Sequence, residues 1–376
     1  MVKEEKKVEY IELIYDLIFV YMVGRNNTLI HDIQNGFVNP RSFIAYVLCT
    51  LAIIQIWNFT TFYINMFGRN GVRDHVFLFI NMYLLYFVGQ STRTDWQDYQ
   101  TMYHVAWGLI LVNVAAQYLI ELRNHRNDPQ VSGLIKRMSL ALLVESVFVF
   151  LAAIPNPDTV LWLSAAAIIS GVALTFYSRR NTTAGSNPVD FMHLSERAML
   201  FVVFTFGEMI IALAVYFIGD GSFRANTIYF SLCAFLIVVG LFLSYEVVYD
   251  KMIDREGNHT GLLYMFLHIL IIFFMNNITA SLEFMREEEI NNLPKVIFLI
   301  VSIVGYFIFL FSLTRYSKNC DKPRKSAVIA AVILTVSFIV LMLIFREMMY
   351  VNIMASVIYV FSMLLLMRKG RKPIHE

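Results

Sequence analysis

Apolar residues are gathered along this chain into twelve runs, each bounded by charged or turn-forming residues. The runs cover residues 8–30, 41–66, 75–92, 100–121, 133–154, 158–178, 192–218, 226–249, 260–283, 294–314, 326–345 and 348–367. Each is close to the length of about 20 residues that an α-helix needs to cross the hydrocarbon core of a bilayer. The pattern predicts an all-α integral membrane protein with about twelve transmembrane helices.

The composition agrees with this pattern. Of the 376 residues, 58% are hydrophobic and only 15% are charged, whereas soluble domains carry about 25% charged residues. The three cysteines, Cys49, Cys233 and Cys320, are too scattered for a disulfide framework or a metal site. We therefore expect a multi-pass membrane protein without a metal or another cofactor.

The placement of basic residues predicts the orientation. Of the 30 Lys and Arg residues, 22 fall in one alternating set of connecting segments, which includes both ends of the chain, and seven in the other set. Cytoplasmic loops carry the excess of Lys and Arg, so both termini are predicted to be cytoplasmic, which requires an even number of helices. The expected location is the cell inner (plasma) membrane.

A weak internal repeat of 184 residues relates two parts of the chain. It pairs Glu12 with Glu196 and His75 with His259. Two six-helix halves would have the same orientation, so a parallel 6+6 duplication is allowed, with chance similarity as the alternative. The predicted organisation is an N-terminal half at 1–178, a cytoplasmic linker at 179–191 and a C-terminal half at 192–376.

The seventh apolar run contains the most unusual charges. Arg197 and Glu208 are eleven residues apart, which places them about 20° apart around a helix. Glu208 would lie near the middle of the membrane, where an ionisable side chain is costly and marks a functional site by default. The alternative is a helix-packing face held by buried polar bonds.

A second acidic pair lies in the first run. Glu12 and Asp16 are four residues apart and share one helix face. In a setting of low dielectric constant one of them would tend to hold a proton, unless a cation or an arginine relieves the repulsion. We expect Arg197 to be that arginine; alternatively, Glu12 is an interfacial residue bonded to water or a helix cap.

Further polar residues in apolar runs extend this candidate substrate or ion path. The full set is Glu12, Asp16, Arg197, Glu208, Glu145, His268 and Asn276. Tyr245 and Glu246 end the eighth run, where they would form either a cytoplasmic gate or an interfacial anchor, since tyrosines favour the membrane–water boundary. His268 has the alternative of a hydrogen-bonded packing residue.

Four stretches together resemble the bacterial low temperature requirement A family. They are Glu12-Leu-Ile-Tyr-Asp16-Leu-Ile-Phe-Val20; Trp57 with Phe62-Tyr63-Ile-Asn65-Met-Phe-Gly-Arg69 and Asp74; His193-Leu-Ser-Glu196-Arg197 with Gly207-Glu208; and Tyr245 with His268. The likeness covers roughly residues 9–275. It departs from the family at 23–27, Val-Gly-Arg-Asn-Asn, where relatives have a small or polar residue followed by Gln.

The resemblance implies a polytopic membrane fold and favours particular residues, but it supplies neither a substrate nor a reaction. Together with Tyr245 and Glu246, the candidates for gate or interface residues are Tyr63, Arg69, Asp74, His193 and Glu196. The family's name records a requirement for growth in the cold.

The favoured function is a secondary-transporter-like permease whose polar path, lined by buried acids, runs between two helical halves. The sequence has no Gly-x-Ser-x-Gly, His-Glu-x-x-His or Walker-type motif, so no catalytic residue is assigned. The alternatives are a membrane-embedded lipid-modifying enzyme and a non-catalytic membrane stress-response protein. Expected partners are the lipid bilayer and a small solute or ion, with proton coupling as one option. The sequence specifies no oligomeric state. Nucleic-acid binding is not expected, since membrane topology accounts for the placement of the basic residues.

Overall fold

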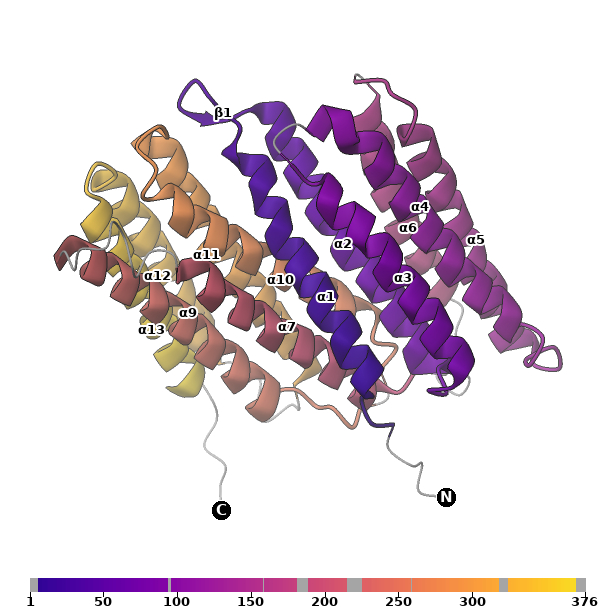
Figure 1. Cartoon of the computed structure of the whole chain (residues 1–376). Helices are drawn as coiled ribbons and strands as arrows, with labels where there is room; N and C mark the ends of the chain where they lie inside the picture. The colour runs from indigo at the N-terminus through magenta and orange to yellow at the C-terminus, as the bar shows by residue number, and fades with distance from the viewer. Residues whose placement is uncertain are drawn as a thin grey trace, which may run out of the picture. The chain divides into compact units, whose positions relative to one another are not determined.

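A computed structural model describes residues 6–93, 96–157, 159–180, 189–214, 225–257, 259–317 and 324–369, without the side chains at 97, 179 and 180. Long α-helices dominate these residues (Figure 1). Helices α1 to α7 are Tyr10–Arg25, Pro40–Phe67, Val72–Ser91, Trp96–Glu121, Pro129–Ala152, Val160–Arg180 and Phe191–Leu213; α9 to α13 are Ala225–Lys251, Leu262–Phe284, Asn292–Ser312, Lys325–Ile344 and Met349–Lys369. The predicted all-α fold is confirmed.

Eight of these helices are long and apolar enough to cross a membrane: α2, α4, α6 and α9 to α13. The helices α1, α3, α5 and α7 fall outside that set. The first of these is only 16 residues long, and α7 contains Glu196, Arg197 and Glu208. The chain is therefore a helical membrane protein with several apolar helices, among which the polar ones stand out.

Turn-forming residues fix several helix ends. Asn39 accepts a hydrogen bond from the Arg41 backbone N–H at the start of α2, and Asp128 accepts bonds from two backbone N–H groups at the start of α5. A proline occupies the first helical position in both cases, where its missing N–H costs nothing. Such caps explain why the predicted starts of these two helices are close to the observed ones.

The first helix is shorter than the predicted run of 8–30. It ends at Arg25 and continues as the 3₁₀-helix η1, Asn26–His31. The Thr28 hydroxyl donates to the Arg25 carbonyl, a local bond that competes with regular α-helix. A short hairpin of β1 (Ile33–Gln34) and β2 (Phe37–Val38) follows, with positive φ at Asn35 and Gly36, as a two-residue turn requires.

The chain divides into two compact units. The first comprises residues up to Gln34, Val38–Phe201 and Glu256–Ile269, so it contains α1 to α6, the beginning of α7 and the beginning of α10. Within it, α3, α4, α5 and α6 pack in chain order, and α2 lies against α1, α4 and α6. This unit contains the polar cluster described below.

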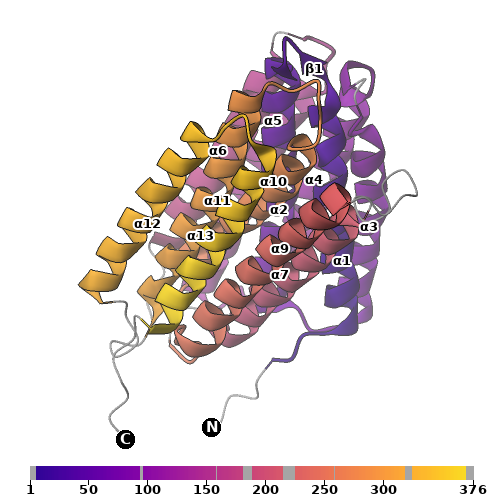
Figure 2. The same ribbon diagram turned by 90° about the vertical axis from the view of Figure 1, so that its left-hand side faces the viewer.

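The second unit comprises Asn35–Phe37, Val202–Arg255 and Leu270–Glu376. In it α13 packs against both α9 and α12, and α12 and α13 lie side by side in Figure 2. The rings of Phe338 and Tyr359 stack at 4.3 Å between centroids, joining α12 to α13.

The predicted halves at 1–178 and 192–376 and the 6+6 repeat stay predictions. The predicted linker at 179–191 includes residues 181–188, which lie outside the described part of the chain, as do residues 215–218 of the seventh apolar run.

Candidate functional site

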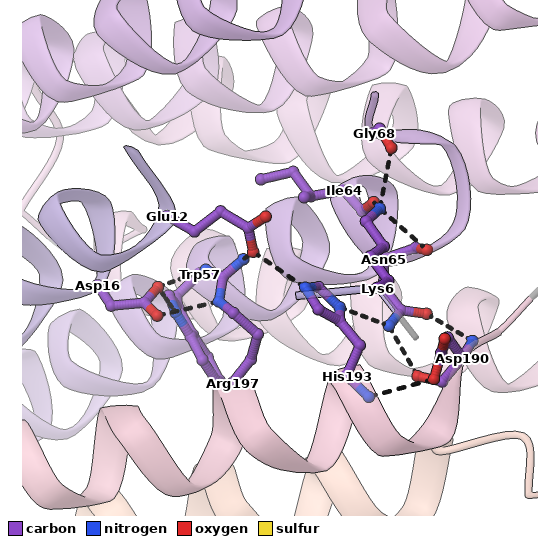
Figure 3. Close-up of polar contacts among 10 residues, drawn as sticks. All are labelled: Lys6, Glu12, Asp16, Trp57, Ile64, Asn65, Gly68, Asp190, His193 and Arg197. Carbon is purple, nitrogen blue, oxygen red and sulfur yellow. Dashed lines mark hydrogen bonds and ion pairs between the residues drawn. The ribbon is translucent and has the colours of Figure 1, made fainter. Parts of the chain in front are cut away.

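Arg197 forms the centre of a buried ion cluster (Figure 3). Its side chain is inaccessible to solvent, and its Nη1 lies 2.5 Å from Oε2 of Glu12. Its Nε donates to Oδ2 of Asp16 at 3.0 Å, and its Nη2 pairs with Oδ1 of the same carboxylate. One guanidinium from α7 thus joins two carboxylates that lie one turn apart on α1.

Trp57 of α2 adds a donor to this cluster. Its Nε1–H donates to Oδ1 of Asp16 at 2.7 Å, while its ring packs 4.3 Å from the ring of Phe201. Asp16 therefore accepts bonds from both an arginine and an indole. Because an uncompensated buried charge costs several kcal/mol, these donors are what make a carboxylate tolerable there.

A second row of polar groups leads from Glu12 to the beginning of α7. The His193 Nε2 lies 3.4 Å from Oε2 of Glu12, and its Nδ1 lies 3.0 Å from the Asn65 amide nitrogen. The Asn65 amide also bonds the backbone of Asp190 in both directions. The Asp190 carboxylate in turn accepts the His193 backbone N–H. This row ties the end of α2 to the first turn of α7.

Lys6 closes the end of α2. Its ammonium group donates to the backbone carbonyls of Ile64, Asn65 and Gly68. The Ile64 carbonyl also accepts the Gly68 backbone N–H, whereas the last carbonyls of a helix generally need partners from outside it. Burial lowers the pKa of Lys6 below its usual 10.5. A lysine at this position is also favourable for the negative end of the helix dipole.

An open pocket of about 280 Å³ lies beside this cap. Charged residues of both signs line it, together with backbone and apolar groups: Lys6, Lys7, Glu9, Ile11, Glu12, Ile64, Gly68, Arg69, Asn70, Asp74 and Leu78. Glu12 belongs both to this lining and to the ion cluster. A ligand in the pocket can therefore reach a carboxylate that is bonded to buried Arg197.

Ion pairs fix the α2–α3 turn at the edge of the pocket. Asp74 accepts the Arg69 backbone N–H at 2.8 Å and contacts the Arg73 guanidinium at 3.3 Å. Both arginines also pair with Glu121 at the end of α4, at 3.2 and 2.8 Å. These contacts hold the loop between α2 and α3 against α4, and they keep the pocket lining in place.

The chemistry open to the cluster follows from its charges. Two carboxylates, Glu12 and Asp16, face one guanidinium, so the cluster can accept one further positive charge. The His193 imidazole lies beside Glu12, and the pocket offers access for a cation from outside. No group of three or more His, Cys, Asp or Glu side chains suited to a metal ion occurs among the described residues.

Four other candidates in the first unit lie outside this cluster. Glu145 of α5 is buried and bonded to Gln55. His268 is buried, and its Nδ1 lies 2.9 Å from the Tyr264 carbonyl, one turn earlier in α10. Tyr63 is buried and packs edge-on against Tyr118 at 5.1 Å. Glu196 is half-buried on α7 and does not enter the ion-pair network.

The remaining candidates belong to the second unit. Glu208 is half-buried, and among the described residues it has no hydrogen bond or ion pair. Asn276 is buried in α10. Tyr245 is buried and stacks on Tyr249, whereas Glu246 is exposed. Their roles as path or gate residues stay predictions.

The sequence reasoning missed several members of the cluster. Trp57 and Asn65 stand within the stretch that resembles the family, which is the one signal that pointed to them. Lys6 was counted only as an orientation signal, and Asp190 precedes the seventh run. Their roles depend on tertiary contacts that bring α1, α2 and α7 together.

Comparison with known proteins agrees with this arrangement of motifs. Over 219 residues the chain is 23% identical to an uncharacterized protein of Rhizobium meliloti (strain 1021), a match that covers 56% of this chain and 51% of that protein. The chain thus matches about half the length of this curated relative. No solved structure matches.

The family described as "Bacterial low temperature requirement A protein (LtrA)" matches residues 7–362. This range includes Glu12, Asp16 and Arg197 and extends well beyond the stretch where the motifs were recognisable in the sequence. The chain therefore belongs to the bacterial low temperature requirement A (LtrA) family.

Proposed function

We propose that this chain is a secondary-transporter-like permease that accepts a small solute or ion at the pocket beside Glu12. A single observation supports the proposal most strongly: the Glu12 carboxylate both lines an open pocket and pairs with fully buried Arg197. A cluster built only for packing would have no need to place one of its carboxylates in the lining of a pocket. Intramembrane ionisable residues commonly mark substrate and ion pathways.

Glu12 would act as the exchange point. A proton or a cationic group that enters the pocket and binds Glu12 weakens its pairing with Arg197, which retains two bonds to Asp16. The ligand then favours whichever helix arrangement tolerates an unpaired Glu12. A ligand shifts a conformational equilibrium only by its difference in affinity for the two states, and the Glu12–Arg197 bond is where that difference would arise.

The proposal includes a topology. Twelve helices would cross the inner membrane with both termini in the cytoplasm, and the Lys6–Lys7 side of the pocket would face the cytoplasm. The predicted halves and their parallel repeat belong to this proposal, as do Glu208 and Asn276 as further path residues and a role in the response to cold stress.

A ligand screen followed by a flux assay tests the function. The purified protein is first screened by thermal shift against ions, amino acids, osmolytes and lipids, because a ligand that binds the native state raises its apparent stability. The ligands that stabilise it are then tested for flux into sealed proteoliposomes with and without a pH gradient. Asp16→Asn should abolish flux, whereas Glu196→Gln is the matched control beside Arg197 and should preserve it.

Two results would contradict the proposal. Product formation in detergent, where no gradient exists, would favour the membrane-embedded enzyme. Flux that is unchanged in Asp16→Asn and Glu208→Gln, together with a loss of stability in both variants, would favour a structural protein of the membrane stress response.

A further inference from the structure

A second buried carboxylate lies apart from the Arg197 cluster. Glu145 of α5 is fully buried, and its Oε2 accepts a hydrogen bond of 3.1 Å from Gln55 Nε2 of α2. The same amide nitrogen lies 3.4 Å from the Ile168 carbonyl of α6. A side chain at Gly171 would place its Cβ 1.8 Å from Glu145 Oε2 and 2.4 Å from Gln55 Nε2. The absence of a side chain on α6 is what makes room for the pair.

This pair is not saturated by the protein. Among the described residues, neither Oε1 of Glu145 nor Oε1 of Gln55 has a hydrogen-bond partner. No described residue forms an ion pair with Glu145. His104 of neighbouring α4 does not supply a counter-charge, because its two ring nitrogens already contact the Ser164 hydroxyl and the Gln100 carbonyl. An ionised carboxylate with one amide donor and no counter-charge is very costly in a protein interior, so this site favours a bound proton.

A polar stripe along α2 leads from this pair to the ion cluster. Gln55, Asn58, Thr61 and Asn65 lie within a sector of about 120° of the helix, and about 15 Å separates the two ends. All four are buried. Asn65 bonds His193, which contacts Glu12 at the pocket. The stripe thus begins at Glu145 and ends at a carboxylate that lines the pocket.

The middle of the stripe also has unsatisfied oxygen atoms. Oδ1 of Asn58 and Oγ1 of Thr61 have no partner within the described parts of the chain. The neighbouring Thr60, on the α1 side of the same helix, instead bonds the Tyr15 hydroxyl at 3.0 Å. Buried polar atoms without protein partners are the sites that internal water commonly occupies.

We propose that the α2 stripe is a hydrated path and that Glu145, at its inner end, is a proton-binding group in exchange with water at the Glu12 pocket. The assignment of this proton as the coupling ion rests on the proposed transport function; the binding site and the path do not. A metal cation is the poorer fit, because small hard cations take about six or more oxygen ligands, and Glu145 is the single carboxylate that the described residues bring to this site.

The test uses dicyclohexylcarbodiimide, a lipid-soluble reagent that modifies protonated carboxyl groups in apolar surroundings. Purified full-length protein is treated across a pH series, in sodium chloride or choline chloride, and the modified residues are located by peptide mass spectrometry. We expect labelling at Glu145 that falls as the pH rises and is the same in both salts. Glu145→Gln, which keeps a side chain of similar shape, should lose this label.

Thr60 and Thr61 lie on different sides of α2, so one serves the test variant of the path and the other serves its control. Asn58→Leu combined with Thr61→Val replaces the middle of the stripe with apolar groups, so labelling should no longer follow a rapid change of aqueous pH. Thr60→Val removes a hydroxyl from the other side of the same helix and should leave that response unchanged.

Each other outcome overturns part of the inference. Absence of label at Glu145 in folded wild-type protein contradicts the proton site, and protection by sodium identifies a sodium site instead. An unchanged pH response in the Asn58→Leu, Thr61→Val variant contradicts the path. Because labelling in detergent needs neither a gradient nor a transported solute, failure to observe flux would leave this test intact.

Discussion

Replacement of Arg197 by methionine should destabilise the protein more than removal of any other single side chain of the cluster. The change leaves Glu12 and Asp16 buried without their guanidinium; the two carboxylate side chains are 3% and 0% exposed. Breaking a buried ion pair by removal of one partner costs about 3–5 kcal/mol. At about 2–4 °C per kcal/mol for a domain of 150–250 residues, the melting temperature should fall by about 6–20 °C.

The assay is thermal unfolding of detergent-purified protein, followed by the loss of the monodisperse peak in size-exclusion chromatography. A triple variant, Glu12→Gln, Asp16→Asn and Arg197→Met, serves as the control. It removes the same arginine but leaves no unpaired charge, and replacement of a whole buried ionic group by neutral residues is often close to neutral. The triple variant should therefore regain most of the stability lost in Arg197→Met.

Two results would refute this reasoning. Wild-type stability in Arg197→Met would mean that the two carboxylates do not depend on the guanidinium. A triple variant no more stable than Arg197→Met would mean that the loss comes from the packing of the arginine side chain and not from charge.

Three further variants test separate contacts. Trp57→Phe removes the indole donor to Asp16 and should lower the free energy of unfolding by about 1.5–3 kcal/mol, since the acceptor is charged. Trp107→Phe is its control, because the Trp107 N–H has no partner among the described residues. Equal losses of stability in the two variants would contradict the role assigned to the Trp57 N–H. Because the pKa of Lys6 is lowered in the folded protein, the unfolded chain binds more protons than the folded one between that lowered pKa and 10.5. The free energy of unfolding should therefore rise with pH over this window. Unfolding measured across a pH series should show this dependence in the wild type and not in Lys6→Met. Glu121→Gln weakens the pairing with two arginines, one of them 67% exposed, and should lower the free energy of unfolding by only about 1 kcal/mol. This loss of stability should shrink in 1 M salt, because salt screens exposed charges. A loss that is undiminished in 1 M salt would show that the pairing is not screened.

The helices were predictable because hydrophobic runs of spanning length have few alternatives. The apolar pattern of the first run does not mark the end of α1 at Arg25, since the continuation into η1 depends on a local hydrogen bond of the Thr28 hydroxyl. The hairpin at Asn35–Gly36 could have been anticipated, because this dipeptide favours a two-residue turn. Its two strands are only two residues long each, and residues 33–38 lie between the runs predicted at 8–30 and 41–66, outside both of them.

The charged members of the site could be chosen from the sequence because charge within an apolar run is expensive. Glu12, Asp16 and Arg197 stand out for that reason alone. Trp57 does not, because an aromatic residue in an apolar run is indistinguishable from ordinary core. Its N–H becomes significant only when α2 brings it within 2.7 Å of Asp16.

Gln55 and Gly171 illustrate the same limit for the Glu145 site. A lone amide and a lone glycine in apolar runs have no periodicity that links them. Their relationship lies in space, where the missing Cβ of Gly171 accommodates the Gln55–Glu145 pair. Sequence reasoning could select Glu145 as a buried acid, but not the groups that surround it.

The most direct test of a functional ion cluster is solute or proton flux in proteoliposomes that contain the charge-neutral triple variant, Glu12→Gln, Asp16→Asn and Arg197→Met. The variant is first shown to be folded and reconstituted at the wild-type level. We predict that it retains its fold and loses flux, because the charges serve binding and exchange at the pocket. Flux at the wild-type rate in the folded triple variant would contradict this account.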